Sequence, residues 1–180
     1  MTTQVTEKPA KKRLTIAELE FLDKNLDNMS ETELRTWFKD LDTTVVDEVK
    51  DTAQEKFMAF VKKVWPSFIE GAHHDEMAAA FERVARGECK RLIINMPPRH
   101  TKSEFASYLL PAWFLGKFPE KKVIQTSHTA ELAVGFGRKV RNLVDSDVYK
   151  SIFPDVGLQA DSKAAGRWAT NKGGDYFAIV

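Results

Sequence analysis

The sequence predicts an α/β fold in which a parallel sheet is flanked by helices and preceded by a small helical segment. Helices and strands alternate after Pro66, and this order produces parallel strands joined by right-handed crossovers. Residues 91–95 read as an apolar run of the kind found in a strand covered on both faces. A tight turn follows, and Lys102-Ser103 then opens a helix, so we expect a strand, a loop and a helix in succession.

The N-terminal residues are expected to form a part of the protein distinct from the α/β region. Residues 1–13 are polar, so we expect a disordered tail, and no apolar segment typical of a signal peptide follows them. Residues 14–50 contain two capping boxes, which begin at Thr15 and Ser30, and apolar residues at helical spacing follow each box. This acidic helical appendage either docks a partner or covers the next domain as a solvated cap, and the sequence does not separate the two.

Two more helices are expected before the apolar run. Residues 45–64 carry apolar side chains on one face, and Pro66 lies just beyond the end of this helix. Residues 74–86 show the same spacing, and Gly87 follows as a stop signal. The second helix therefore leads the chain into the predicted strand at 91–95.

The remaining elements continue the alternation. We expect a helix at 103–115, a strand at 122–127 and a helix from Thr129 to about residue 144. Two short runs, 167–170 and 176–180, flank a stretch rich in turn residues and predict a hairpin.

Composition sets outer limits on function. The chain has 180 residues, of which 43% are hydrophobic, and a net charge of +1, so we expect an ordinary globular protein with no strongly basic surface. The single Cys89 cannot form an internal disulfide, which fits a reducing cytoplasm, and it lies outside any metal-ligand spacing. The longest apolar stretch, 108–118, is too short to span a bilayer, so no membrane segment is expected.

The turn before Lys102-Ser103 has the layout of a phosphate-binding loop. A bound triphosphate requires backbone N–H groups, the positive end of a helix, an ammonium on its outer phosphates and a hydroxyl on magnesium. Lys102 and Ser103 stand where the ammonium and the hydroxyl belong. The plainer alternative is that Lys-Ser after an apolar run is only a helix start, since that dipeptide is common.

This loop departs from the standard G-x-x-x-x-G-K-[ST] pattern. Met96 and Thr101 occupy the two glycine positions, so we expect a turn built from conformations that are open to residues with a Cβ. Pro97-Pro98 fixes φ and removes two donors, which predicts a stiffer loop with fewer amides for phosphate. Arg99 adds a positive charge that the standard pattern lacks.

The segment Arg-Leu-Ile-Ile-Asn-Met-Pro-Pro-Arg-His-x-Lys-Ser resembles the deviant Walker A motif of the large terminase subunits of tailed bacteriophages. These proteins are the ATPases that drive DNA into procapsids. The resemblance covers roughly residues 52–180 and extends to His73-His74-Asp75 upstream and to residues 171–174 downstream. It implies a P-loop NTPase-type sheet, of which residues 51–180 would form the front part.

The resemblance also implies cofactors and site residues. The cofactors would be ATP and Mg²⁺, with Ser103 as a magnesium ligand and with Lys102 and Arg99 in catalytic roles. Arg99 would contact the γ-phosphate, or it would be a surface residue that the nucleotide neutralises. The residues expected to bind the nucleotide are Pro98, Arg99, His100, Thr101, Lys102, Ser103, Glu104 and His74.

Two other groups invite functional interpretations. In terminases a residue of the upstream region contacts adenine, so His73 or His74 would stack on the base, unless each is simply a histidine at a helix start. Arg138 and Arg141 share one helix face and would contact DNA phosphate or the nucleotide of a neighbouring subunit; a solvated basic face is the alternative. The implied partners are double-stranded DNA, the portal protein, the small terminase subunit and other copies in a ring, in the host cytoplasm at the procapsid portal.

Phosphoryl transfer also needs an acid that holds magnesium. In the terminase pattern it follows a later apolar strand, and no such strand ends in two acids before Val180. We therefore expect the front part of a motor ATPase, cut before Walker B and inactive by itself. Two alternatives remain: a helicase-like, DNA-stimulated P-loop ATPase, and a non-catalytic helical interaction module with a decayed nucleotide site.

Overall fold

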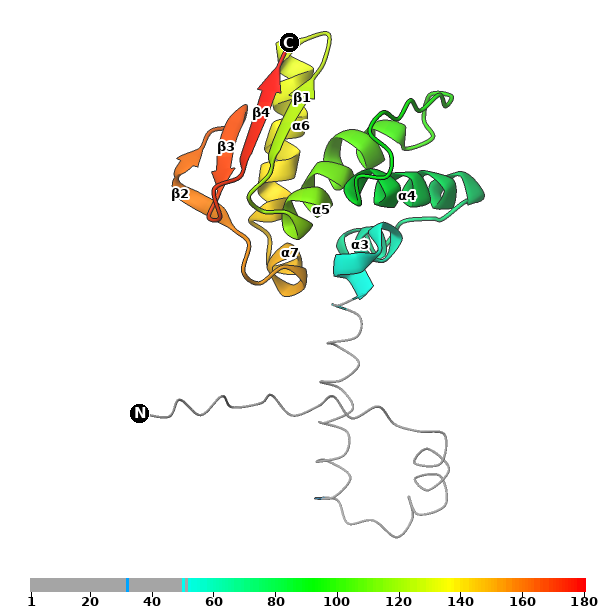
Figure 1. The fold of residues 1–180 in the computed structure, drawn as a ribbon, viewed down its shortest axis with the longest axis horizontal. Coiled ribbons are helices and arrows are strands. Elements are labelled where there is room, and N and C mark those ends of the chain that lie inside the picture. Colours follow the sequence, from blue (N-terminus) through cyan, green and yellow to red (C-terminus); the bar gives the residue numbers. More distant parts are fainter. Residues whose placement is uncertain (1–31, 33–49, 51) are drawn as a thin grey trace. The chain divides into compact units, whose positions relative to one another are not determined.

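The computed structural model describes residue 32, residue 50 and residues 52–180. The chain divides into two compact units, Met1–Val49 and Lys50–Val180, and nearly all of the described residues belong to the second (Figure 1). The expected tail at 1–13, nearly all of the appendage at 14–50 and the first part of the helix at 45–64 lie outside the described residues.

The helices before the loop end where the sequence predicts, but the single helix expected at 45–64 is interrupted at Lys56. Helix α3 (Phe57–Val64) ends just before Pro66, as expected, and it buries one apolar face; extended Lys56 separates it from a helical turn at 52–55. Helix α4 (Ala72–Ala85) ends one residue before Arg86, and Gly87 follows with φ 77°. This left-handed glycine terminates the helix as the sequence predicts.

The apolar segment after α4 is the clearest correction. Residues 91–97 form no strand: among the described residues their backbone groups make no hydrogen bond to another backbone group. Leu92 is 37% exposed and Ile93 is 85% exposed, so the predicted buried strand at 91–95 is wrong for this structure. The physical reason is that a strand needs a neighbouring backbone as partner, and none of the described strands pairs with this segment.

The helix after the loop is longer and less regular than expected. Residues 102–117 are continuously helical, but Glu104–Leu109 form a π-helix, η2, before α5 (Leu110–Lys117). The N–H of Leu110 donates to the carbonyl of Phe105, five residues earlier. Pro111 has no N–H and would clash with a carbonyl of the preceding turn, so a wider turn before it relieves the helix.

The four-stranded sheet is mixed, and this corrects the expectation of a parallel sheet. Its order is β1-β4-β3-β2. Strand β1 (Lys122–Thr126) pairs in parallel with β4 (Asp175–Ile179), as strands joined by a long connection do. The predicted hairpin between β3 (Arg167–Thr170) and β4 is confirmed, but it and β2 (Leu158–Lys163) make the other pairings antiparallel.

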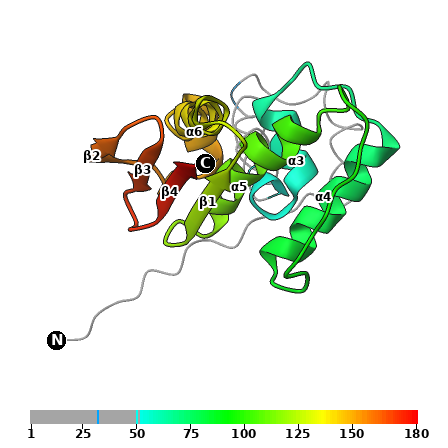
Figure 2. The same ribbon diagram turned by 90° about the horizontal axis from the view of Figure 1, so that it is seen from above.

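Helix α6 (Ala130–Val144) packs along one face of this sheet, and its bounds agree with the prediction (Figure 2). The side chain of Thr129 caps it by accepting a hydrogen bond from the N–H of Leu132. Among the described elements no helix covers the other face of the sheet, where Ile124 is 65% exposed. The described unit is therefore an α/β structure whose mixed sheet has α6 on one face and the other helices beside it.

Two elements of the structure were not predicted from the sequence. Helix α7 (Asp147–Ile152) begins after Ser146, whose side chain accepts from the N–H of Tyr149, and it buries only one short apolar turn. Strand β2 carries little apolar alternation, and it lies at the edge of the sheet, where it pairs with β3.

The core is aromatic. Phe57 contacts Phe81, Phe105 and Trp113 edge to face, with ring centroids 5.2 to 5.6 Å apart, so α3, α4 and the helix after the loop share one centre. Trp113 and Trp168 are also fully buried. None of the described helices combines the length and the apolar character that crossing a membrane requires.

Candidate functional site

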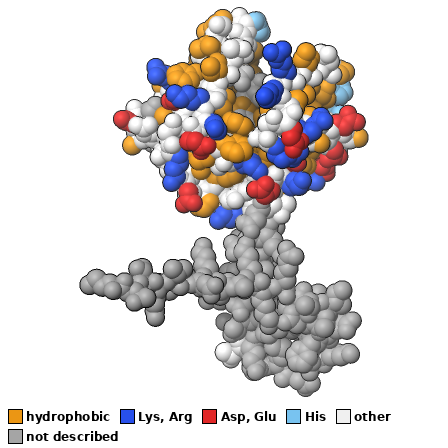
Figure 3. All heavy atoms as spheres, in the orientation of Figure 1, with side chains coloured by type: hydrophobic (Ala, Val, Ile, Leu, Met, Phe, Trp, Pro, Cys, Tyr) orange, Lys and Arg blue, Asp and Glu red, His pale blue; other side chains and the backbone are white. Residues whose placement is uncertain are grey.

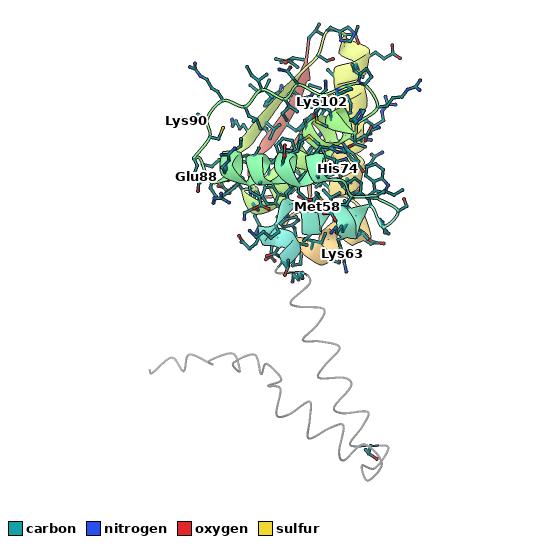
Figure 4. All side chains as sticks on the ribbon, turned by 90° about the vertical axis from the view of Figure 1, so that its right-hand side faces the viewer. Met58, Lys63, His74, Glu88, Lys90 and Lys102 are labelled. Carbon is teal, nitrogen blue, oxygen red and sulfur yellow. The ribbon has the colours of Figure 1, made fainter. Side chains whose placement is uncertain are left out.

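The candidate phosphate loop, residues 97–103, lies between the extended segment and the start of a helix. Its last two residues, Lys102 and Ser103, already have helical structure, and the carbonyl of Thr101 accepts the hydrogen bond from Phe105 N–H. Figure 4 shows Lys102 near one end of the unit, at the start of its helix, and His74 at the start of α4. The predicted succession of loop and helix start is therefore present, although the strand before it is not.

The backbone of the loop offers a row of free donors. Within the described residues, none of the N–H groups from 99 to 104 donates a hydrogen bond to a protein acceptor. Free N–H groups in a turn that leads into a helix give the surface a positive potential, which favours an anion. The loop can thus hold an anion with main-chain donors although both usual glycines are missing.

The loop conformation corrects one expectation. Arg99 has φ 65° and Thr101 has φ 56°, so two residues with side chains occupy the left-handed region. Thr101 stands at a position that the standard pattern gives to glycine, and it adopts a backbone conformation that glycine tolerates more readily. The expectation that residues with a Cβ avoid this region is therefore wrong at both positions.

The predicted cationic and hydroxyl groups are available at the site. Lys102 is half-buried, and its Nζ makes a long contact of 3.4 Å with the carbonyl of Met96, so most of its donor capacity is unused. Ser103 and Arg99 are exposed, and in the described part of the chain neither side chain has a hydrogen bond or ion pair. His100 is also exposed, and its Nδ1 lies 2.9 Å from the carbonyl of Pro98, which fixes the turn.

His74 occupies a different environment from the one that base stacking requires. Its side chain is 5% exposed and packs against Phe68 and Phe105, with ring centroids 4.8 and 5.0 Å away. The N–H of Gly71 donates to Nδ1 at 3.0 Å, and Nε2 lies 2.6 Å from Oγ1 of Thr101. His74 therefore contacts the loop itself, while the half-buried His73 is the more accessible ring of the pair.

The expected nucleotide contact Glu104 is engaged with a neighbouring helix. Its carboxylate forms an ion pair with Lys139 of α6, with Nζ and Oε1 2.8 Å apart. Lys139 also borders a shallow hollow along α6, whose other lining residues are Thr129, Glu131, Leu132, Gly135 and Phe136. Sequence reasoning missed this ion pair, because nothing in the sequence shows which residue of a later helix faces Glu104.

The two arginines of α6 that were expected to contact DNA or a neighbouring nucleotide differ in exposure. Arg138 is exposed, whereas Arg141 is half-buried and donates to the side chain of Asn142. Figure 3 shows lysine and arginine side chains interspersed with acidic ones over the visible face of the described unit. Among the described residues no group of three or more histidine, cysteine, aspartate or glutamate side chains could hold a metal ion.

Comparison with protein-family models gave no match, and no curated protein or solved structure was significantly similar to this chain. The functional interpretation therefore depends on the residues and geometry of the loop.

Proposed function

We propose that this chain binds the phosphates of ATP, with Mg²⁺, at the loop 97–103. The observation that carries the proposal is the run of free N–H groups from 99 to 104 beside the ammonium of Lys102. Main-chain donors at a helix start supply directed hydrogen bonds, and Lys102 supplies a charge that can follow the outer phosphates. Ser103, exposed at the same helix start, would provide the oxygen ligand for the magnesium ion that accompanies the nucleotide.

The wider role that we propose is that of the ATP-binding part of a phage terminase large subunit, which powers translocation of viral DNA into procapsids. Support comes from the resemblance of residues 91–103 to the deviant Walker A segment, together with an α/β unit in which the loop leads into a helix. A P-loop NTPase-type sheet, double-stranded DNA, the portal protein and the small terminase subunit are parts of the same proposal.

Calorimetric titration of the 180-residue protein with Mg·ATP tests the proposed binding. Replacing Lys102 by alanine removes a charge-assisted contact worth roughly 1.5–3 kcal/mol, so we expect the affinity to fall about 10- to 150-fold. Lys172→Ala is the matched control, because it removes an exposed lysine from the turn between β3 and β4 and should leave the affinity unchanged. Equal affinity of the wild type and the Lys102→Ala variant, or no binding by the wild type, would refute the proposal.

We expect binding by this chain without sustained hydrolysis. Phosphoryl transfer to water requires a carboxylate that orients the nucleophile or holds the metal. The nearest described acid in sequence, Glu104, is paired with Lys139. Release of phosphate measured over hours should match the rate of a blank, and multiple turnovers by the purified chain would contradict this part of the proposal.

A further inference from the structure

The hydrogen bonds around His74 show which nitrogen of its neutral ring carries the proton. An amide N–H can only donate, so Nδ1, which receives the N–H of Gly71 at 3.0 Å, must be the unprotonated nitrogen. The proton of the neutral ring therefore lies on Nε2, which donates to Oγ1 of Thr101 at 2.6 Å. The hydroxyl of Thr101 in turn donates to the carbonyl of His100 at 2.7 Å. Every donor in this chain of hydrogen bonds has an acceptor.

The same hydrogen bonds end on a loop residue with a left-handed backbone. Thr101 has φ 56°, and a left-handed conformation is unfavourable for a β-branched residue. Such a conformation persists only where the surroundings hold it. The Thr101 side chain contacts the His74 ring on one side and the His100 carbonyl on the other. These two contacts hold the backbone of Thr101, directly before Lys102, in its conformation.

We infer that His74 is a positioning residue: through Thr101 it holds the loop in the conformation that presents its N–H groups to an anion. This inference rests on the proposed phosphate binding for its ligand, but the coupling between His74 and the loop can be tested without one. It gives His74 a role distinct from stacking on a base.

The surroundings of His74 favour the neutral ring at pH 7. Burial lowers its pKa below the ordinary value, and the neighbouring His73 lowers it further. Asp75 and Glu70 act in the opposite direction, and His100 adds a smaller lowering effect. A second proton would have to enter at Nδ1, where it would face the N–H of Gly71. The doubly protonated ring keeps Nε2–H as a donor to Thr101 but loses the contact with Gly71 that orients it, so acidification displaces the ring and, through Thr101, disturbs the loop.

Nuclear magnetic resonance of the 180-residue protein tests the coupling without a ligand. We expect the His74 ring to be the Nε2–H tautomer at pH 7.5 and to titrate with a midpoint below the ordinary histidine value of about 6.5. The amide resonances of Lys102 and Ser103 should shift with the same midpoint. In Thr101→Val, which keeps the side-chain shape but removes the hydroxyl, the shift should disappear. An Nδ1–H tautomer, or loop amides that ignore the titration, would overturn the inference.

A binding measurement with Mg·ATP at pH 7.5 tests the consequence for the ligand. Thr101→Val should lower the affinity about fivefold or more, and Thr101→Gly, which adopts the left-handed backbone without help, should recover most of the loss. Thr126→Val, at an exposed threonine at the end of β1, is the control and should bind as the wild type does. Equal binding by Thr101→Val and the wild type would count against the inference. If the wild type binds no nucleotide, the proposed function fails, and the titration above still decides whether His74 positions the loop.

Discussion

Lys139 of α6 and Glu104 of the helix after the loop form an ion pair, with Nζ and Oε1 2.8 Å apart. The ammonium also lies over the rings of Phe136 and Tyr108, at 5.5 and 5.8 Å from their centroids. Both partners are partly exposed, so the pair contributes little to stability. Its consequence is local, because Lys139 neutralises a carboxylate two residues after Lys102, where a bound phosphate would otherwise meet a negative charge.

Removal of this neutralisation should weaken binding of ATP. In Lys139→Ala the Glu104 carboxylate is left without its partner, and we expect the affinity for Mg·ATP to fall about two- to fivefold at low salt, with a smaller effect at high salt. The double variant Lys139→Ala/Glu104→Gln should regain the loss, since it removes the uncompensated charge. Calorimetry on the four proteins of this cycle makes the measurement; additive effects would show that the two residues do not act as a pair.

Two glycines of α6 should respond oppositely to alanine. A Cβ at Gly135 would meet no atom within 4 Å, so Gly135→Ala should raise the free energy of unfolding by about 0.5–1 kcal/mol through lower backbone entropy of the unfolded chain. A Cβ at Gly137 would lie 2.5 Å from the carbonyl oxygen of Ala165, so Gly137→Ala should destabilise by about 1–3 kcal/mol. Urea unfolding compares them, and equal effects would mean that α6 does not approach the sheet as described.

A substitution at Ile93 tests whether the segment 91–97 is exposed, as the structure shows. Because Ile93 is 85% exposed, Ile93→Ala should change the free energy of unfolding by less than about 0.5 kcal/mol. Ile152, which is fully buried on α7, is the control, and its replacement by alanine should cost about 2–5 kcal/mol. A comparably large loss at Ile93, measured by urea unfolding, would show that this segment is a buried strand after all.

Two buried tyrosines differ in the partner of the hydroxyl. Tyr149 donates to the carbonyl of Ala112 at 2.9 Å, so Tyr149→Phe should lower stability by about 1 kcal/mol. The hydroxyl of Tyr176, whose ring stacks on Trp168, has no hydrogen-bond partner among the described residues. Tyr176→Phe should therefore be neutral or slightly stabilising, since it removes a desolvated polar group. Thermal unfolding distinguishes the two variants, and a loss of stability in Tyr176→Phe would point to an additional partner of that hydroxyl.

Features that depend on residues close together in the sequence were predicted correctly, whereas features that need a distant partner were not. The end of α4 at Gly87, the start of α6 at Thr129 and the β3–β4 hairpin depend on neighbouring residues, and all were predicted. The run at 91–95 has the composition of a buried strand, but strand formation requires a partner that composition does not supply.

The candidate site likewise combines features that the local sequence predicts with contacts between distant residues that it does not predict. Lys102 and Ser103 at a helix start could be recognised from their order in the sequence, and both lie at that helix start in the structure. The left-handed Thr101 and its bond to His74 could not, because they join residues that are 27 positions apart. The mixed pairing of the sheet was missed for a related reason: β2 lies at an edge and carries little apolar pattern.

The most direct test of phosphate binding by the loop is a titration of ¹⁵N-labelled protein with Mg·ATP, followed through its amide resonances. Our account predicts saturable shifts at the free N–H groups from 99 to 104, with much smaller changes at Leu132 and Gly135 in the hollow of α6. Shifts confined to the hollow, or none at residues 99–104 at saturating nucleotide, would contradict it.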